Sequence, residues 1–337
     1  MFDNGKYFNN IKIHTQYSIC EGAIKIDDLA EYCKKKKIKS LGLADSLNLC
    51  GALEFSDKLS KVGTQPIIGT QINLRDQNIL GKVTLYAKTE DGYKNLTKLS
   101  SLSYLKSKET EEPACKIKDL IENNKELILL TGNYRDFFGK LFQTNKLKNF
   151  DETISLLKKN FENRIYFEIQ RHSENDEKNF ETFLLNKSKS LEIPLIASQE
   201  VFYINKEMYE AHDTLRCIGE KNFVDDKNRF KLSNQHYIKD NHELERLYAD
   251  IPEALENNYN FHLRFNFKLK KSKPILPSIA NKHSNSPEDE LLRQAKNGLE
   301  NRLKNFIVKK NASYSIDQLK NIYNDRLDHE INIINSM

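Results

Sequence analysis

The feature of this sequence that most constrains its fold is the alternation of short apolar runs with longer amphipathic stretches. Seven runs have the length and composition of strands, at residues 11–14, 41–44, 66–74, 82–87, 127–131, 164–169 and 194–198. Helical patterns lie between most of them, for example at 26–36, 52–61, 150–161 and 176–190. This alternation predicts parallel βα units. The stretch 72–87 is different, because turn residues at 76–81 separate two extended halves without a helix, and it predicts a hairpin.

The fold class that accommodates these units most economically is α/β, as a distorted TIM-like (β/α)7 barrel. A doubly wound open sheet stays possible, because periodicity does not show whether a sheet closes on itself. In a βα barrel the functional residues lie at the carboxyl ends of the strands. The side chains at those positions therefore indicate the function.

The chain after about residue 206 has a different organisation. Helical patterns at 207–218, 241–249 and 252–260 are followed by a basic stretch, by Pro274 and Pro277, and by a linker at 278–287. Two amphipathic helices are expected at 288–306 and 315–337. The second has Leu319, Ile322, Leu327, Ile331 and Ile334 at its apolar positions and ends without a Gly or Pro signal, so we expect the chain to be part of a longer protein.

The composition indicates in which compartment the protein is expected and which kinds of partner it could have. No apolar run reaches the roughly 20 residues of a membrane span, and the first 14 residues lack the apolar core of a signal peptide, so we expect a cytoplasmic protein without a membrane partner. The five cysteines form no CxxC pair and are expected to be buried free thiols. The net charge of +5 is only a weak hint of a polyanionic partner. The basic run 34–37 is typical of a solvated helix end.

Polar side chains stand at most of the predicted strand ends. They are His14, Asp45, Gln71, Asn133, His172 and Glu200, with Phe202 nearby and Glu21 in the first βα loop. Two histidines and three carboxylates around one barrel mouth would suffice, by ligand type, for one divalent metal. Spacing does not show that they converge, and the alternative is that each histidine is a satisfied core residue.

Ordered sequence blocks between residues 8 and 262 resemble the PHP domains of bacterial DNA polymerase III alpha subunits, of an alphaproteobacterial type. The long block is IHTQYSICEGAIKIDDLAEYCKKKKIKSLGLADSLNLCGALEF, and the shorter ones are QPIIGTQ, DGYKNL, ELILLTG, YFEIQRH, PLIASQEVFY, EAHDTLRCI and ADIPEALENN. The tail blocks RQAKNGLENRL and YNDRLDHEINIINSM are similar to the segment with which that family enters its palm domain. The resemblance implies a PHP domain at 1–277, a linker at 278–287 and a truncated palm start at 288–337.

In an active member the resemblance implies a trinuclear metal site of His, Asp and Glu ligands, and this chain departs from it. The matched positions that are kept or tolerably replaced are His14, Glu21, Asp45, His172 and Glu200. The degenerate positions are Lys12 and Phe202, where the family has histidines, Ser46, where it has the His of an Asp-His pair, and Gln71, where it has a Glu. Lys12 would place a fixed ammonium where cations should bind. We therefore expect a vestigial pocket that holds no metal and has no catalytic residue.

The resemblance also implies what the rest of such a protein does. Its polymerase carboxylates, which hold two Mg²⁺ ions, would lie beyond Met337, so this chain alone is expected to be inactive and to need no cofactor. The expected function is DNA replication, with the domain acting as a scaffold and as a docking surface for a proofreading exonuclease subunit. Other replisome subunits are expected partners, and DNA is expected to bind through the parent polymerase. The alternatives are an active metal-dependent phosphoesterase or 3′ exonuclease, and a free-standing binding module.

Overall fold

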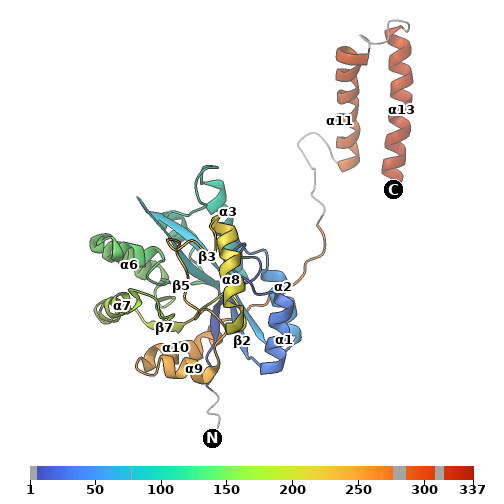
Figure 1. Cartoon of the computed structure of the whole chain (residues 1–337). Coiled ribbons are helices and arrows are strands. Elements are labelled where there is room, and N and C mark those ends of the chain that lie inside the picture. The colour runs from blue at the N-terminus through green and yellow to red at the C-terminus, as the bar shows by residue number, and fades with distance from the viewer. Residues whose placement is uncertain (1–5, 77, 276–285, 308–314) are drawn as a thin grey trace. The chain divides into compact units, whose positions relative to one another are not determined.

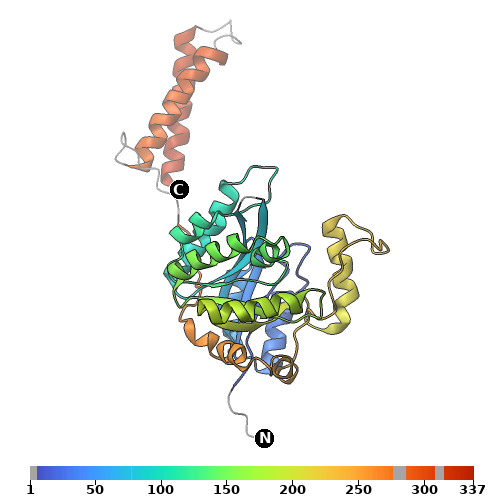
Figure 2. The same ribbon diagram turned by 90° about the vertical axis from the view of Figure 1, so that its left-hand side faces the viewer.

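The computed structural model describes residues 6–76, 78–275, 286–307 and 315–337. It divides into two compact units, Met1–Lys271 and Ser272–Met337. The first unit contains a single sheet whose strands are surrounded by helices (Figure 1), as the view turned by 90° also shows (Figure 2). Its strands are β1 Asn10–Ile13, β2 Ser40–Ser46, β3 Gln65–Asp76, β4 Ile79–Ala87, β5 Leu127–Leu130, β6 Ile165–Gln170, β7 Leu195–Ser198 and β8 Glu200–Val201.

The helices of the first unit follow the sequence patterns closely. They are α1 Ile26–Lys36, α2 Ala52–Lys61, α3 Glu90–Leu105, α4 Ile117–Glu122, α5 Phe137–Gln143, α6 Leu147–Phe161, α7 Glu177–Leu191, α8 Tyr209–Glu220, α9 Asn241–Leu247 and α10 Pro252–Phe261. In α1 the first turn carries Asp27 and Asp28, and lysines fill the last turn. This charge order complements the helix dipole, so the lysine run is the solvated helix end that the sequence predicts.

The order of the strands, β7-β6-β5-β4-β3-β2-β1-β8, follows the chain around the sheet. All pairings are parallel except those of β4, which is antiparallel to both β3 and β5. The predicted hairpin is thus confirmed, and it forms part of the barrel wall. Sequential order without a reversal point excludes the doubly wound alternative, in which strand order switches direction.

The two ends of the sheet approach each other, so that the sheet is nearly closed into a barrel. The strands β7 and β8 are separated by one residue, yet β8 pairs with β1 at the opposite end of the sheet. A buried asparagine of α10, Asn258, secures the seam, because its Nδ2 donates to the carbonyls of Asn9 and Ala197, each at 2.9 Å. The backbone N–H of Asn9 donates in return to Asn258 Oδ1 at 2.8 Å. The fold is an α/β barrel, as predicted, with eight strands where the sequence predicted seven.

The interior of the barrel is apolar at the end away from the polar strand termini. One cluster joins side chains from β1, β3, β4, β5, β6 and β7 with two aromatic rings from α10 and the segment after it: Ile11, Ile67, Tyr86, Ile128, Leu130, Tyr166, Ile196, Phe261 and Phe265. Gly69 lets the ring of Tyr86 lie across the interior, since a Cβ there would stand 2.4 Å from that ring. Two further clusters fill the space between the sheet and its helices.

The second unit is a pair of helices. The helix α11, Pro287–Arg302, continues into the π-helical segment Leu303–Ile307, and α13 spans Ile316–Ser336 (Figure 1). Leu319 and Ile331 of α13 are buried, whereas Ile322 and Ile334 are more than half exposed. The predicted linker 278–287 lies outside the described residues except for Ser286 and Pro287, and the assignment of 288–337 to a palm domain stays a prediction.

The expectation about cysteines is only partly correct. All five are free thiols, and Cys33, Cys115 and Cys217 are buried. Cys20 is half-buried and Cys50 is exposed, because both lie in loops after strands and not in helix faces that pack on the sheet. Among the described residues, no helix is both long and apolar enough to cross a membrane.

Candidate functional site at the barrel mouth

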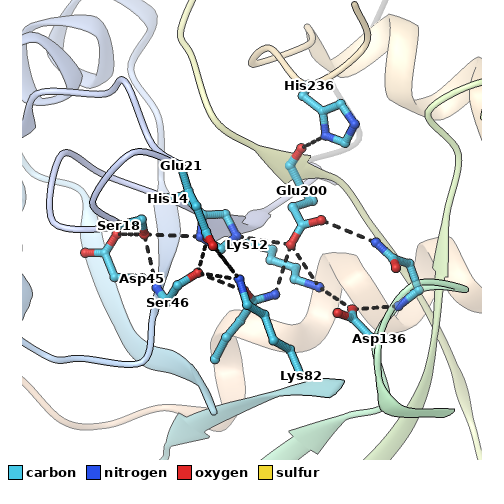
Figure 3. Close-up of polar contacts among 12 residues, drawn as sticks. Lys12, His14, Ser18, Glu21, Asp45, Ser46, Lys82, Asp136, Glu200 and His236 are labelled. Carbon is cyan, nitrogen blue, oxygen red and sulfur yellow. Dashed lines mark hydrogen bonds and ion pairs between the residues drawn. The ribbon is translucent and has the colours of Figure 1, made fainter. Parts of the chain in front are cut away.

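The carboxyl ends of the strands carry a network of polar side chains, most of them buried (Figure 3). At its centre is Lys12 of β1, whose side chain is fully buried. Its Nζ lies 3.4 Å from Glu200 Oε1 and 3.5 Å from Glu168 Oε2 and from Asp136 Oδ2. Burial opposes the charge on this ammonium, but the three carboxylates outweigh burial and raise the pKa of Lys12 above its ordinary value.

The carboxylate of Glu200 joins most of the other members of the network. Its Oε1 lies 3.1 Å from His14 Nε2 and accepts a hydrogen bond from Gln71 Nε2 at 2.9 Å. Its Oε2 accepts from Asn133 Nδ2 at 3.3 Å. Burial alone would raise the pKa of Glu200, but Lys12 and then His14 hold the pKa well below its usual range. The pKa of Asp136 is raised instead, because burial and the neighbouring carboxylates outweigh Lys12 there.

A second ammonium, that of Lys82 on β4, occupies the outer part of the mouth. Its Nζ donates to both carboxylate oxygens of Glu21, at 3.0 and 2.9 Å, and to Ser46 Oγ at 2.9 Å. Ser46 Oγ in turn donates to Glu21 and, at 3.2 Å, to Gln71 Oε1. Burial raises the pKa of Glu21, but Lys82, His14 and Ser46 together lower it below its ordinary value. Each of these carboxylate oxygens therefore already has a donor.

Asp45 stands apart from these two ammonium groups and binds the loop after β1. Its Oδ1 accepts from Thr15 N at 2.6 Å and from Ser18 Oγ at 2.7 Å, and its Oδ2 accepts from Thr15 Oγ1 at 2.7 Å. Burial nevertheless raises the pKa of Asp45 above its ordinary value. These contacts fix the turn that carries His14, whose Nδ1 lies 3.3 Å from Ser18 Oγ.

His172 lies beside the mouth and takes part in a stacked pair of imidazoles. Its ring is parallel to that of His236, with centroids 4.0 Å apart. The backbone N–H of Glu200 donates to His172 Nε2 at 3.2 Å, so the ring proton of neutral His172 is on Nδ1. Burial, and then His236, lower the pKa of His172 well below its ordinary value. His236 binds the backbone carbonyl of Glu200 through Nδ1 at 2.9 Å, which holds the start of β8 in place (Figure 3).

Phe202, at a position where the resemblance implies a ligand histidine, has its ring stacked on His14 with centroids 4.6 Å apart. It also stacks on His212, whose Nε2 lies 2.7 Å from the carbonyl oxygen of Glu21. Burial lowers the pKa of His212 to about 4, so this histidine is neutral near pH 7. The aromatic ring thus fills the space between two imidazoles and offers no lone pair to a cation.

The structure brings some of the sequence-predicted residues together and separates others. His14, Gln71 and Glu200 are in direct contact, Glu21 and Ser46 form the second group with Lys82, and Asp45 and His172 bind backbone and loop groups. One detail of the sequence analysis was wrong, because Gln71 does not end its strand. The strand β3 continues to Asp76 as one arm of the hairpin, and Gln71 lies where the pairing with β2 ends, opposite Ser46.

Sequence reasoning missed several members of the network: Ser18, Lys82, Asp136, Glu168 and His236. Asp136 lies three residues after Asn133 in the loop that follows β5. Glu168 lies within an apolar strand, where a buried acid is a detectable signal. Lys82 and His236 are distant from any matched motif, and only the folded chain places them here. A cleft of about 470 Å³ opens over the mouth and is lined by Glu21, Lys82, Asn133, Asp136 and Glu200 among others.

A metal ion does not fit these residues as they are arranged. The ammonium groups of Lys12 and Lys82 lie among the carboxylates, and both oxygens of Glu21, Glu168 and Glu200 already have donors. Within the described part of the chain, no three His, Cys, Asp or Glu side chains are grouped so that they could hold a metal ion. The arrangement is that of an ion-pair network in which lysine ammonium groups occupy positions among the carboxylates.

Comparison with known proteins shows which family this chain is similar to. Residues 10–172 match the family model of the PHP domain. The chain is 34% identical over 343 residues to the DNA polymerase III subunit alpha of Caulobacter vibrioides, which covers 99% of this chain and 29% of that protein. The chain contains a PHP domain of the DNA polymerase III alpha subunit family. The PHP domain thus includes β1 to β6 and the turn that carries His172.

Other relatives agree with this assignment. The DNA polymerase III subunit alpha of Rickettsia bellii is 33% identical across 98% of this chain, and that of Borreliella burgdorferi is 35% identical across 80% of it. The chain spans 25–29% of the length of these three relatives. Among solved structures, a putative metal-dependent phosphoesterase from Bifidobacterium adolescentis superposes with a TM-score of 0.40 and 11% identity, over 57% of this chain and 86% of that one.

Proposed function

We propose that this chain is the PHP module of a replicative DNA polymerase III alpha subunit and that its barrel mouth has a structural role and no catalytic one. The observation that carries the proposal is the position of two lysine ammonium groups at the mouth. Lys12 forms ion pairs with Asp136, Glu168 and Glu200, and Lys82 forms an ion pair with Glu21. Where this domain stabilises the polymerase, lysine ammonium groups in place of metal ions would let it fold without a supply of metal.

The electrostatic argument is one of competition for the same carboxylates. A divalent ion would have to displace an ammonium that is covalently attached to the chain and fully buried. Expelling or deprotonating Lys12 would leave a fully buried group without its partners, which costs roughly 3–5 kcal/mol when one partner of a buried pair is lost. Carboxylates bound in this way are poor ligands for a metal and poor bases for hydrolysis.

Metal content tests this part of the proposal. We expect the full chain, purified with added Mn²⁺ or Zn²⁺ and then desalted, to retain less than one equivalent of metal by elemental analysis. Two or three equivalents of metal per chain would instead support the alternative, a phosphoesterase or 3′ exonuclease that uses His14, Glu21, Asp45, His172 and Glu200. A Lys12→Met variant analysed in parallel shows whether Lys12 itself excludes the metal.

The second part of the proposal concerns partners. In the parent polymerase, DNA and Mg²⁺ would be bound by the polymerase domains, and this module would bind the proofreading exonuclease subunit of the same replisome. Support comes from the family assignment and from the architecture of the barrel, in which Asn258 of α10 is hydrogen-bonded to both ends of the nearly closed sheet. A rigid surface loses little conformational entropy when it binds.

Salt dependence distinguishes exonuclease binding from binding to DNA. We expect the chain to bind the exonuclease with similar affinity at about 50 and 200 mM salt, because an apolar-centred protein interface responds weakly to salt. Phosphate contacts lose orders of magnitude in affinity over that same range. If the exonuclease did not bind at either salt concentration while duplex DNA bound tightly at the lower one, the docking proposal would be wrong.

A further inference from the structure

A second buried lysine, Lys239, lies outside the mouth network and has no acidic partner. Lys239 as a whole residue is 4% exposed. Its Nζ donates to the backbone carbonyl of Gln235 and, at 3.5 Å, to Gln199 Oε1, and it lies 4.5 Å from the centroid of the Tyr237 ring. Within the described ranges, no carboxylate oxygen lies within 4.0 Å of this ammonium.

An uncompensated buried ammonium is unusual, since charged groups in protein interiors are nearly always paired. The partners of Lys239 are neutral, and neutral acceptors compensate a charge less well than a carboxylate does. Burial accordingly lowers the pKa of Lys239 to about 8. The free energy that burial costs here would be recovered if an anion bound next to the ammonium.

The surroundings of Lys239 provide room for such an anion. Lys239 lines a cleft of about 300 Å³ together with Arg171, Ser173, Gln235 and Arg246. Arg171 is neutralised by Glu181 and Asp250. The Nε of Arg246 donates to the carbonyl of His242 at 3.3 Å, and among the described residues its guanidinium has no carboxylate within 4.0 Å. The cleft therefore has two cations, one buried and one exposed, that have no anionic partner.

One acidic side chain also lines the cleft, that of Glu243. Its Oε1 accepts a hydrogen bond from Tyr237 Oη at 2.6 Å, and the Tyr237 ring lies beside Lys239. Glu243 is within electrostatic range of Lys239 but makes no ion pair with it. It reduces the positive charge of the cleft without supplying the missing partner of the lysine.

We propose that this cleft, formed by the segment before α9, by α9 itself and by the loop after β6, is a binding site for a small oxyanion held between Lys239 and Arg246. The ligand class is a phosphate or carboxylate group, free or as part of a larger ligand. Ser173 and Gln235 supply neutral polar groups at the same cleft. The site is separate from the mouth network and does not depend on the proposed role in replication.

Titration of the full chain with inorganic phosphate and, in parallel, with acetate tests the site and identifies the oxyanion. Ionic strength is kept constant with sodium chloride, and binding is followed by calorimetry and by the rise in melting temperature. We expect saturable binding of one anion per chain. Binding of phosphate alone identifies a phosphate ligand, and binding of acetate alone identifies a carboxylate ligand.

Variants decide whether the binding residues are the ones named. Lys239→Met and Arg246→Gln should each weaken binding about tenfold or more, as the loss of one charge-assisted hydrogen bond predicts. Lys125→Gln, at an exposed lysine far from this cleft in sequence, is the matched control and should bind like the unmodified chain. Absence of saturable binding by either anion, or unchanged affinity in folded Lys239→Met, would overturn the proposal.

Discussion

Two buried lysines of one barrel, Lys12 and Lys239, differ in whether their ammonium groups have anionic partners. Lys12 is surrounded by three carboxylates within 3.5 Å, and the pKa of its ammonium is raised. Lys239 has only neutral acceptors, and the pKa of its ammonium is lowered to about 8. The difference shows that the charge partners, and not burial itself, decide whether an interior lysine stabilises the fold or reduces its stability.

The geometry of the two regions explains why they differ. Lys12 is on β1, where the carboxyl-terminal half of β6, the start of β8 and the loop after β5 converge, so acidic side chains from three elements reach its ammonium. Lys239 lies in the segment between α8 and α9, where a cleft adjoins it. The ammonium of Lys12 has its anionic partners within the protein, whereas the ammonium of Lys239 receives its anionic partner from the proposed ligand. The difference leads to three predictions about stability.

The largest expected effect is that of Lys12→Met. Methionine has a similar length but no charge, so the variant leaves Asp136, Glu168 and Glu200 buried together without a cation. We expect the free energy of unfolding to fall by about 3–5 kcal/mol, as for the loss of one partner of a buried ion pair. Chemical denaturation measures this. Lys82→Met is the control, because Lys82 is partly exposed and should lose much less; equal losses at both positions would refute the special role of Lys12.

Stability as a function of pH provides the next test, on Lys239. Its pKa is about 8 in the folded chain, against about 10.4 when unfolded, so the unfolded chain binds more protons between these values. Stability from this group should therefore rise as pH increases from about 8 to about 10, by up to roughly 3 kcal/mol. The difference in unfolding free energy between the unmodified chain and Lys239→Met isolates the contribution. A difference that does not change with pH would show that Lys239 is compensated after all.

The smallest of the three effects is that of Asp45→Ala. Asp45 accepts three hydrogen bonds from the loop after β1, and all three donors, Thr15 N, Thr15 Oγ1 and Ser18 Oγ, would lose this acceptor in the variant. We expect a loss of about 1–3 kcal/mol in the free energy of unfolding, with no change in any phosphoesterase activity. Asp45→Asn keeps one acceptor oxygen and should lose less. Full stability combined with the loss of a measurable phosphoesterase activity would show that the mouth is catalytic.

Much of this protein could be predicted from its sequence alone. The spacing and the length of the apolar patterns predict α1 and α2 at their observed bounds, because the buried face of an amphipathic helix recurs every three to four residues. The hairpin of β3 and β4 was predicted from turn residues, although its first strand proved longer than expected. The polar strand ends predicted a polar mouth, and the structure shows one. That ligand positions of the family have changed in this chain stays a prediction from the resemblance.

Tertiary structure alone decided which charges meet. The partners of Lys12 come from positions 136, 168 and 200, and the acid bound by Lys82 lies 61 residues away, so no local pattern contains these pairs. Closure of the sheet was likewise undecided by the sequence, because it depends on Asn258 reaching both Asn9 and Ala197. Periodicity records which face of an element is buried, whereas electrostatic compensation depends on distances between elements, and only the folded chain sets those distances.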